Sequence, residues 1–413
     1  MGGIGFKKSF LNAAMRGSTL VSKFLLLLVI ARVYSVGEVG VYGLIFSLVS
    51  LFVYLLGLQY YNVSGRNLAG AAGVQRKGIW LVRHFNVVLS VLVFAPLILL
   101  VPLFYYELRG YAFVIFFLLL TEFCAGEFYR ILIYFEKQIH ASVLLFLRNG
   151  LWIWIFVIWI FVEDYFWGSF PDIRYLYYLW MTGGVLALLL GIWFLGKYRI
   201  YLLKVRFLSF RSLFYEAKSS FNFFISALSQ RLIFTLDKYF IVLSAGVELT
   251  GVYTFYVGIA ASVNSFMDAG VYSIYYPRLI KIVKQSELFV KEFKRFKKIV
   301  IGVSISIFLI YGLMIFPVLK FTGDSLYKEY LPLFILVMMA VTVLNLSRIY
   351  HYMLYIKREE KYILRASVIN VIVFAVLALP MAFAFNVYGV GFSLLFSFTL
   401  LFYLKKIYSK RNG

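Results

Sequence analysis

The sequence predicts an all-α polytopic membrane protein with about twelve transmembrane helices, arranged as two parallel six-helix lobes around a central cavity. The 413 residues are 63% hydrophobic and only 14% charged. Apolar runs of about 20 residues, long enough to cross a hydrocarbon core of about 30 Å, recur along the whole chain. The second half also repeats features of the first half. Because backbone groups in lipid must be paired within their own segment, we expect the spans to be helices.

Breaks rich in charge or glycine divide the apolar runs into two sets of six. The first set is 9–33, 40–62, 84–104, 111–133, 141–163 and 174–196. The second set is 219–244, 251–274, 299–319, 331–355, 363–385 and 387–404. This division predicts an N-terminal lobe at 1–196, a linker at 197–218 and a C-terminal lobe at 219–413. Because the linker mixes Lys and Arg with Leu, Phe and Tyr, it predicts an amphipathic helix on the cytoplasmic membrane surface.

The distribution of Lys and Arg predicts the orientation in the membrane. Of the 41 Lys and Arg residues, four lie in the odd-numbered connections, seven within spans, and thirty in the even-numbered connections and both tails. Cytoplasmic connections carry the excess of Lys and Arg, so both termini should be cytoplasmic. The net charge of +23 then belongs mainly to a surface beside anionic lipids, and no nucleic-acid partner is expected.

Features of the first half return in the second half, 210 to 213 positions later. The phrase VGEVGVYG at 36–43 returns as GVELTGVYT at 246–254. Further matches in the same order are Lys8-Ser9 with Lys218-Ser219, Asn12 with Asn222, and Arg66 with Arg278. Because each half has an even number of spans, both halves enter the membrane in the same direction. Parallel repeats of this kind predict a shared cavity between them.

The repeated phrases resemble those of a known family. The run Arg32-Val-Tyr-Ser-Val-Gly-Glu38-Val-Gly40-Val-Tyr42 resembles the signature after the first helix of Wzx-type polysaccharide flippases, and so does the run from Asp237-Lys238 through Gly246 to Gly251-Val-Tyr253. These flippases for O-antigen or capsule repeat units belong to the multidrug/oligosaccharidyl-lipid/polysaccharide exporter superfamily.

The resemblance implies a V-shaped, two-lobed transporter in the bacterial plasma (inner) membrane. Its cargo would be an undecaprenyl-pyrophosphate-linked oligosaccharide, moved outward by alternating access. A polysaccharide polymerase and a chain-length regulator are the protein partners that it implies.

Basic residues within the spans are the candidates for cargo binding. Asn12, Arg16, Thr19 and Lys23 lie within about 60° of one another on the first span. A charge at the centre of a span costs about 2.5–3.5 kcal/mol unless it meets water, a partner or a ligand, so we expect this stripe to face a cavity. Arg and Lys suit phosphate oxygens. The substrate-binding candidates are Asn12, Arg16, Lys23, Arg148, Arg231 and Arg348.

The sign of the charge within the spans favours an anionic cargo. With Arg130 assigned to the inner connection, the spans hold seven basic and four acidic residues, an excess of three positive charges, or two if Arg32 lies at the interface. The acidic ones could couple transport to H⁺ or Na⁺, and they are Glu122, Glu127, Asp237 and Asp268. An alternative for Glu127 is a structural pair with Arg130 at i, i+3. No other cofactor is expected, and the three scattered histidines predict no metal cluster.

Two other functions remain open at this stage. One is a cation-coupled multidrug exporter of the same superfamily. The other is a membrane-embedded polysaccharide polymerase or glycosyltransferase. An enzyme is not expected, because the longest outer connection, 163–174, is short and no nucleotide-binding glycine loop is present. Flexing is expected at Gly183-Gly184 and at kinks caused by Pro96 and Pro380.

Overall fold

The protein is helical throughout the part that the structure describes. The computed structural model describes residues 2–283 and 285–411, and their side chains except those of residues 2–10, 286 and 411. Helices make up 92% of the structure, and the described part contains no strand. Ten helical segments in this part are long and apolar enough to cross a membrane. The prediction of an all-α, multi-pass membrane protein is confirmed.

The first half of the chain contains six of these ten segments, several of them assembled from shorter helices. In order the elements are α1 (Gly2–Val33), α2 (Val36–Gly57), α3 (Tyr61–Gly70), α4 (Gly73–Val91), the 3₁₀ helix η1 (Leu92–Leu100), α5 (Val101–Phe104), η2 (Tyr106–Tyr111), α6 (Ala112–Tyr134), α7 (Gln138–Phe146), the π-helical turn η3 (Leu147–Leu151), α8 (Trp152–Trp167) and α9 (Arg174–Phe194). Pro96 lies within η1, since its ring excludes the regular α-helical hydrogen bond.

The second half contains the remaining four segments, and two of them are broken. The elements are the 3₁₀ helix η4 (Gly196–Lys204), α10 (Phe210–Met267), the π-helical turn η5 (Asp268–Tyr272), α11 (Ser273–Ile282), α12 (Ser286–Thr322), α13 (Ser325–Glu329), α14 (Leu331–Ile356) and α15 (Glu360–Arg411). Gly246, with φ 83°, interrupts α10, and Phe385 and Asn386 interrupt α15. Counting both broken segments twice gives the twelve predicted spans. Pro380 lies inside α15, five residues before its break.

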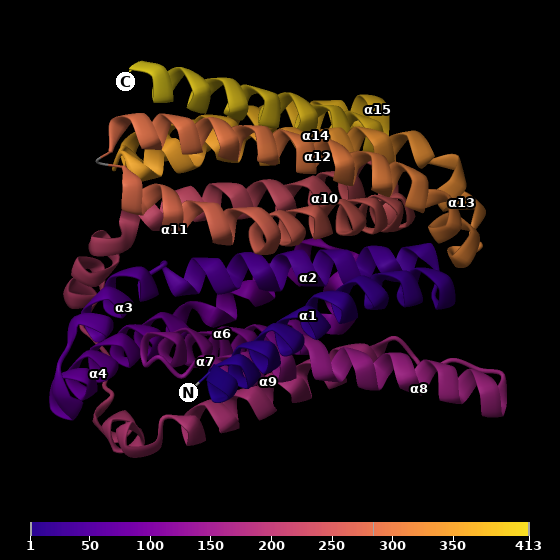
Figure 1. The fold of residues 1–413 in the computed structure, drawn as a ribbon. Helices are drawn as coiled ribbons and strands as arrows, with labels where there is room; N and C mark the ends of the chain where they lie inside the picture. Colours follow the sequence, from indigo (N-terminus) through magenta and orange to yellow (C-terminus); the bar gives the residue numbers. More distant parts are fainter. Residues whose placement is uncertain (1, 284, 412–413) are drawn as a thin grey trace. The chain divides into compact units, whose positions relative to one another are not determined.

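The internal contacts divide the chain into two compact units. The first unit comprises residues 1–26 and 45–228, and the second comprises 27–44 and 229–413. The end of α1 and the beginning of α2 therefore belong with the second unit. In that unit α14 packs against both α12 and α15 (Figure 1). In the first unit α6 packs against α9.

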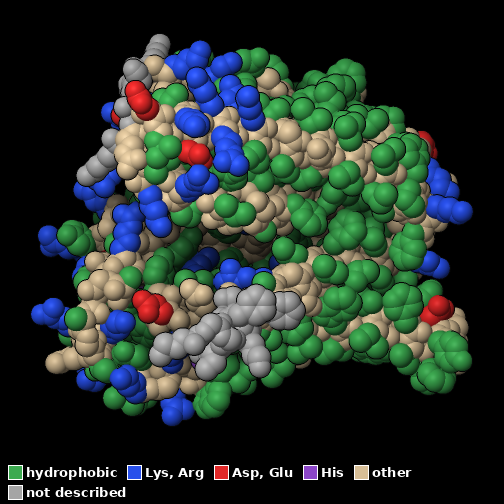
Figure 2. Space-filling model, viewed as in Figure 1, with side chains coloured by type: hydrophobic (Ala, Val, Ile, Leu, Met, Phe, Trp, Pro, Cys, Tyr) green, Lys and Arg blue, Asp and Glu red, His purple; other side chains and the backbone are tan. Residues whose placement is uncertain are grey.

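Lys and Arg gather at one end of each unit. Figure 2 shows them, in the first unit, at the end that carries α3 and α4, and in the second unit at the end near the C-terminus and α11. The basic run Lys291, Lys294, Arg295, Lys297 and Lys298 in α12 belongs to the second group. Hydrophobic side chains cover much of the rest of the face shown. This separation is typical of helices whose middle lies in lipid and whose ends lie at the interface.

Three local expectations differ from the structure. The linker 197–218 is not one helix, because the 3₁₀ helix η4 ends at Lys204 and α10 begins at Phe210 after an extended stretch. The second span begins at Val36 and not at residue 40, so the first repeated phrase lies wholly within the first two turns of α2. The pair Gly183-Gly184 lies inside a regular helix, and a Cβ at Gly184 would come within 2.8 Å of Thr121 Cβ. These glycines allow close packing of α9.

Candidate functional site

The polar stripe on α1 lies beside α7 in the first unit. Arg16 Nε donates a hydrogen bond of 3.2 Å to Ser142 Oγ, and Ser142 Oγ donates to Asn12 Oδ1. Thr19 is buried and bonds within its own helix. Arg16 and Lys23 are exposed. One edge of the stripe therefore packs against α7, and the two cations remain accessible.

A buried ion pair joins α6 to η3 in the first unit. Arg148 Nε lies 3.3 Å from Glu122 Oε2, and Trp180 Nε1 donates to Glu122 Oε1 at 2.8 Å. Arg148 belongs to the π-helical turn η3, a distortion often found at functional sites. Gly126 makes room for the guanidinium, because a Cβ there would lie 2.7 Å from an Arg148 NH group. The structure therefore pairs a predicted substrate-binding residue with a predicted coupling residue.

Glu127 belongs to a second, more deeply buried network. Its carboxylate contacts Arg130, as the i, i+3 spacing predicts, and its Oε2 lies 3.1 Å from His84 Nε2. His84 Nδ1 in turn lies 2.8 Å from Ser64 Oγ. Ser64, His84 and Glu127 are 0%, 1% and 2% exposed, so no substrate reaches this Ser–His–Glu row. The network ties α3, α4 and α6 together.

Asp237 is satisfied by neighbours from its own half of the chain. It is fully buried in the second unit, Lys238 Nζ lies 3.2 Å from its Oδ1, and Tyr253 donates to its Oδ2 at 3.1 Å. Tyr253 is the tyrosine of the second repeated phrase. The two ends of the run from Asp237-Lys238 to Tyr253 therefore form one buried cluster.

A further cluster of charged groups in the second unit surrounds Asp268 and Arg348. Arg348 NH1 donates to Asp268 Oδ1 at 2.8 Å, and its guanidinium lies 5.5 Å from the centre of the Tyr272 ring. Asp268 begins the π-helical turn η5. His351 lies one turn after Arg348 on α14, and Lys405 on α15 lies close enough for the three basic groups to interact electrostatically.

Lys405 is the functional candidate that sequence reasoning missed. Its position after the last predicted span assigned it to the tail, but it is only 6% exposed. The signal was present in the spacing, because the buried residues Phe398 and Leu401 precede it at i−7 and i−4. A lysine in register with an apolar stripe is expected to point into the helix bundle.

Two buried tyrosines pack inside the second unit. Tyr256 donates to the carbonyl of Tyr327, and Tyr272 donates to that of Asn345 at 3.0 Å. Both side chains are buried. The described residues contain no group of three potential metal ligands.

Comparisons with solved structures identify the fold. Family models and curated proteins gave no match. An inward-facing multidrug resistance MATE family transporter of the MOP superfamily shares 13% identity over 96% of this chain and 94% of its own, with a TM-score of 0.66. The chain has the MATE fold. A MOP superfamily transporter from Pyrococcus furiosus (11% identity, 98% and 93% covered, TM-score 0.53) and a eukaryotic MATE transporter (14%, 98% and 95%, 0.52) are also similar.

In this MATE fold the ten predicted site residues divide between the two units. The first unit holds Asn12, Arg16, Lys23, Glu122, Glu127 and Arg148. The second holds Arg231, Asp237, Asp268 and Arg348, with Arg231 half-buried on α10. The MATE likeness agrees with the superfamily named from the sequence, and the Wzx type is a matter for proposal.

Proposed function

We propose that this chain is a flippase that moves a polyprenyl-pyrophosphate-linked oligosaccharide across the bacterial inner membrane by alternating access. The MATE fold supports a transporter, because the similar proteins are transporters. The Wzx-like phrases support the cargo. Both termini would be cytoplasmic, where the basic connections meet anionic lipids.

The charge balance inside the spans is the observation that carries the proposal. Each of the four candidate carboxylates has a basic partner, in the pairs Glu122–Arg148, Glu127–Arg130, Asp237–Lys238 and Asp268–Arg348. Within the described residues Arg16 bonds only the neutral Ser142, and Lys405 has no acidic partner. The acids are thus compensated and cations remain. A pyrophosphate fits such an interior, and a cationic drug does not.

Cations that could bind a pyrophosphate occur in each unit. Arg16 and Lys23 supply accessible positive charge in the first unit, and Arg348 with the buried Lys405 supplies positive charge in the second. Arg148 and Arg231 support these groups from neighbouring spans. The cargo drives the conformational change only if it binds one conformation more tightly than the other.

Coupling to H⁺ or Na⁺ would act through the ion pairs. Asp268 is the best placed of the four carboxylates, because 57% of its side chain is exposed while Glu127 and Asp237 are buried. A proton on Asp268 would release Arg348 from its partner. The freed guanidinium could then bind phosphate, which links proton entry to cargo affinity.

A cation-coupled multidrug exporter is the second candidate. It is favoured by the TM-score of 0.66 with a multidrug resistance transporter. Against it stands the charge balance described above. One similar structure, the Pyrococcus furiosus protein, is described as having a binding pocket of reverse polarity that suggests a different function. We extend that reasoning to this chain.

Reconstitution distinguishes the two functions. Proteoliposomes carry a fluorescent undecaprenyl-pyrophosphate-linked oligosaccharide in both leaflets, and a membrane-impermeant glycosidase attacks only the outer leaflet. Without protein the accessible fraction should stay near one half, and with protein it should approach completion. Ethidium transport, measured in the same vesicles, should match that of empty vesicles. If the accessible fraction stays near one half and ethidium is transported, the flippase proposal is wrong and the protein is a multidrug exporter.

A further inference from the structure

A pocket opens at the end of the first unit where the basic residues gather. It has a volume of about 380 Å³ and lies among α3, α4 and the beginning of α10. This volume falls within the range of about 300–1,000 Å³ that is typical of small-molecule sites. None of the predicted site residues lines the pocket.

A carboxylate with fixed orientation forms the floor of this pocket. Glu216, which is 9% exposed, accepts hydrogen bonds from Tyr60 OH at 2.9 Å on one oxygen and from Arg83 Nε at 2.7 Å on the other. Burial and the nearby Glu216 carboxylate raise the pKa of the Tyr60 phenol, so the hydroxyl remains a donor. Arg83 NH2 also lies 2.6 Å from Oε1, so Oε2 is the oxygen that retains acceptor capacity for a further hydroxyl.

The chain is bent at this point in order to place Tyr60. Leu58 and Gln59, between α2 and α3, both have positive φ values, 47° and 52°. Two consecutive non-glycine residues in this region are uncommon, and such strain is concentrated at ligand-binding positions. The turn directs the Tyr60 phenol toward a residue that lies 156 positions later in the chain.

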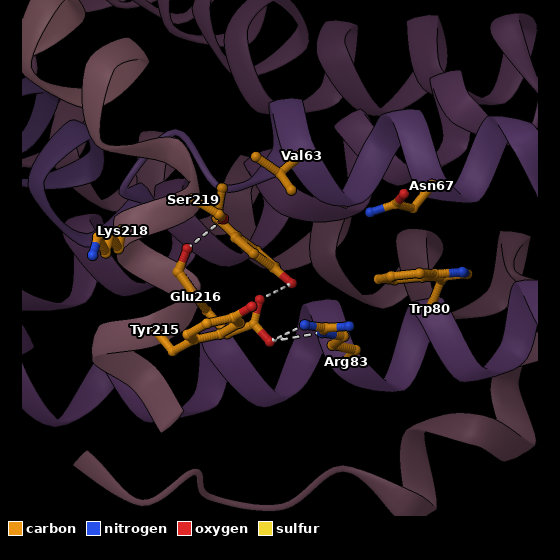
Figure 3. A pocket seen from close by; sticks show the side chains of 9 residues that line it. Val63, Asn67, Trp80, Arg83, Tyr215, Glu216, Lys218 and Ser219 are labelled. Carbon is orange, nitrogen blue, oxygen red and sulfur yellow. Dashed lines mark hydrogen bonds and ion pairs between the residues drawn. The ribbon is translucent and has the colours of Figure 1, made fainter. Parts of the chain in front are cut away.

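Aromatic and amide groups form the walls. Figure 3 shows the Trp80 ring and the Asn67 amide on one side of the pocket and Tyr215 on the other. The Arg83 guanidinium lies 4.9 Å from the centre of the Trp80 ring, which fixes the plane of that ring. The Tyr215 side chain is 70% exposed, so its ring is available to a ligand.

We infer that this pocket binds one sugar ring of the lipid-linked cargo. The C–H face of a sugar packs against aromatic rings, while its hydroxyls both donate and accept hydrogen bonds. The pocket offers aromatic faces, a carboxylate acceptor and an amide that can do both. A phosphate is a weaker fit, because Arg83 is already engaged by Glu216 and the Lys218 side chain points away from the other lining residues (Figure 3). The assignment of the sugar to the cargo rests on the proposed flippase function.

Saturation-transfer NMR on the full chain tests the binding directly. The protein is held in lipid nanodiscs, since glycoside detergents carry sugars of their own. The probes are methyl glycosides of hexoses, N-acetylhexosamines and hexuronic acids, with the open-chain polyol sorbitol as the reference. At least one glycoside class should receive magnetisation, and sorbitol should not. Failure of all three classes, or equal transfer to sorbitol, would overturn the sugar site.

Variants locate the signal in this pocket. Trp80→Ala and, separately, Asn67→Ala should abolish the transfer. Trp193→Ala, which removes an exposed tryptophan of α9 in the same unit, should retain it. Trp80→Phe keeps an aromatic face and should retain part of the signal. Full transfer in a folded Asn67→Ala or Trp80→Ala protein would place the sugar elsewhere and refute the inference.

The binding test and the transport test fail separately. If sugar binding depends on Trp80 but flipping is absent in proteoliposomes, the sugar site is supported and the flippase function is contradicted. If flipping occurs but no sugar binds, the flippase function is supported and the sugar site is contradicted.

Discussion

Gly40 of α2 and Gly251 of α10 meet backbone to backbone in the second unit. A Cβ on Gly40 would lie 3.0 Å from the Gly251 nitrogen and would clash with the carbonyl oxygen of Val247. A Cβ on Gly251 would clash with the carbonyl of Val36. The two copies of the repeated phrase therefore cross each other at their glycines. Small residues at a crossing allow membrane helices to approach closely, which gives the repetition a physical meaning.

Replacing Gly40 with alanine should therefore destabilise the protein despite the higher helix propensity of alanine. Overpacking of a tight contact costs about 1–3 kcal/mol, more than the gain of about 1 kcal/mol in propensity. Gly302→Ala is the matched control, because it lies in α12 with nothing within 4 Å of its Cβ position. In thermal unfolding, Gly40→Ala should melt below the wild type and Gly302→Ala at or above it. A Gly40→Ala protein as stable as the wild type would contradict the close crossing.

The pair of Glu122 and Arg148 should be coupled in stability. Arg148→Ala leaves a buried carboxylate without its cation, which costs up to about 3 kcal/mol at a site that is not fully closed. Removing Glu122 as well relieves that penalty. A double-mutant cycle followed by sodium dodecyl sulfate titration should give a coupling of about 1–3 kcal/mol. Additive effects would show that the pair contributes no mutual stabilisation.

The accessible cations of α1 should matter for transport and little for folding. Arg16→Ala and Lys23→Ala should each reduce flipping at least about tenfold, the equivalent of about 1.4 kcal/mol of cargo binding. Their amounts in the membrane should match the wild type. Ser142→Ala is the control, because it removes only the neutral partner of Arg16. Wild-type transport in the Arg16 and Lys23 variants would make the stripe structural.

Lys405 should show opposite effects on stability and transport. Replacing a buried cation that lacks an acidic partner with Met removes a desolvation cost, so Lys405→Met should be at least as stable as the wild type. Its transport should fall strongly. Lys410→Met, at the exposed end of the same helix, should change neither quantity. A destabilised Lys405→Met protein with normal transport would assign Lys405 a purely structural role.

The spans could be predicted because each one depends on the hydrophobicity of a single continuous stretch of the sequence. The apolar runs predict the helices; the break at Gly246 falls in the predicted connection 245–250, and the break at Phe385–Asn386 falls at the predicted boundary at residue 386. The prediction for the linker was wrong because it also relied on local composition alone. Composition indicated an amphipathic helix, but the chain leaves the helix after Lys204 and starts α10 at Phe210, where Asn86 and Ser90 of α4 accept the backbone amides of residues 206 and 208.

The candidate site was predictable only where both partners lie close in the sequence. Glu127 and Arg130 could be paired from their i, i+3 spacing, and the structure confirms that pair. The partners of Glu216 come from positions 133 and 156 residues earlier, so no local pattern marks them. The burial of Lys405 was not predicted, because it depends on which face of a long helix is buried. A single sequence indicates that face only weakly.

The unit boundary has a consequence for dividing the gene. Residues 27–44 belong to the compact unit that is otherwise formed by 229–413. There the Leu27 side chain packs against Gly258, and the Tyr239 hydroxyl donates a hydrogen bond to the carbonyl of Leu44. A fragment that begins at residue 210 would therefore lack the part of the second unit's core that residues 27–44 contribute. Separately translated halves, cut in the extended stretch at 205–209, should be recovered only as a complex, each donating what the other lacks.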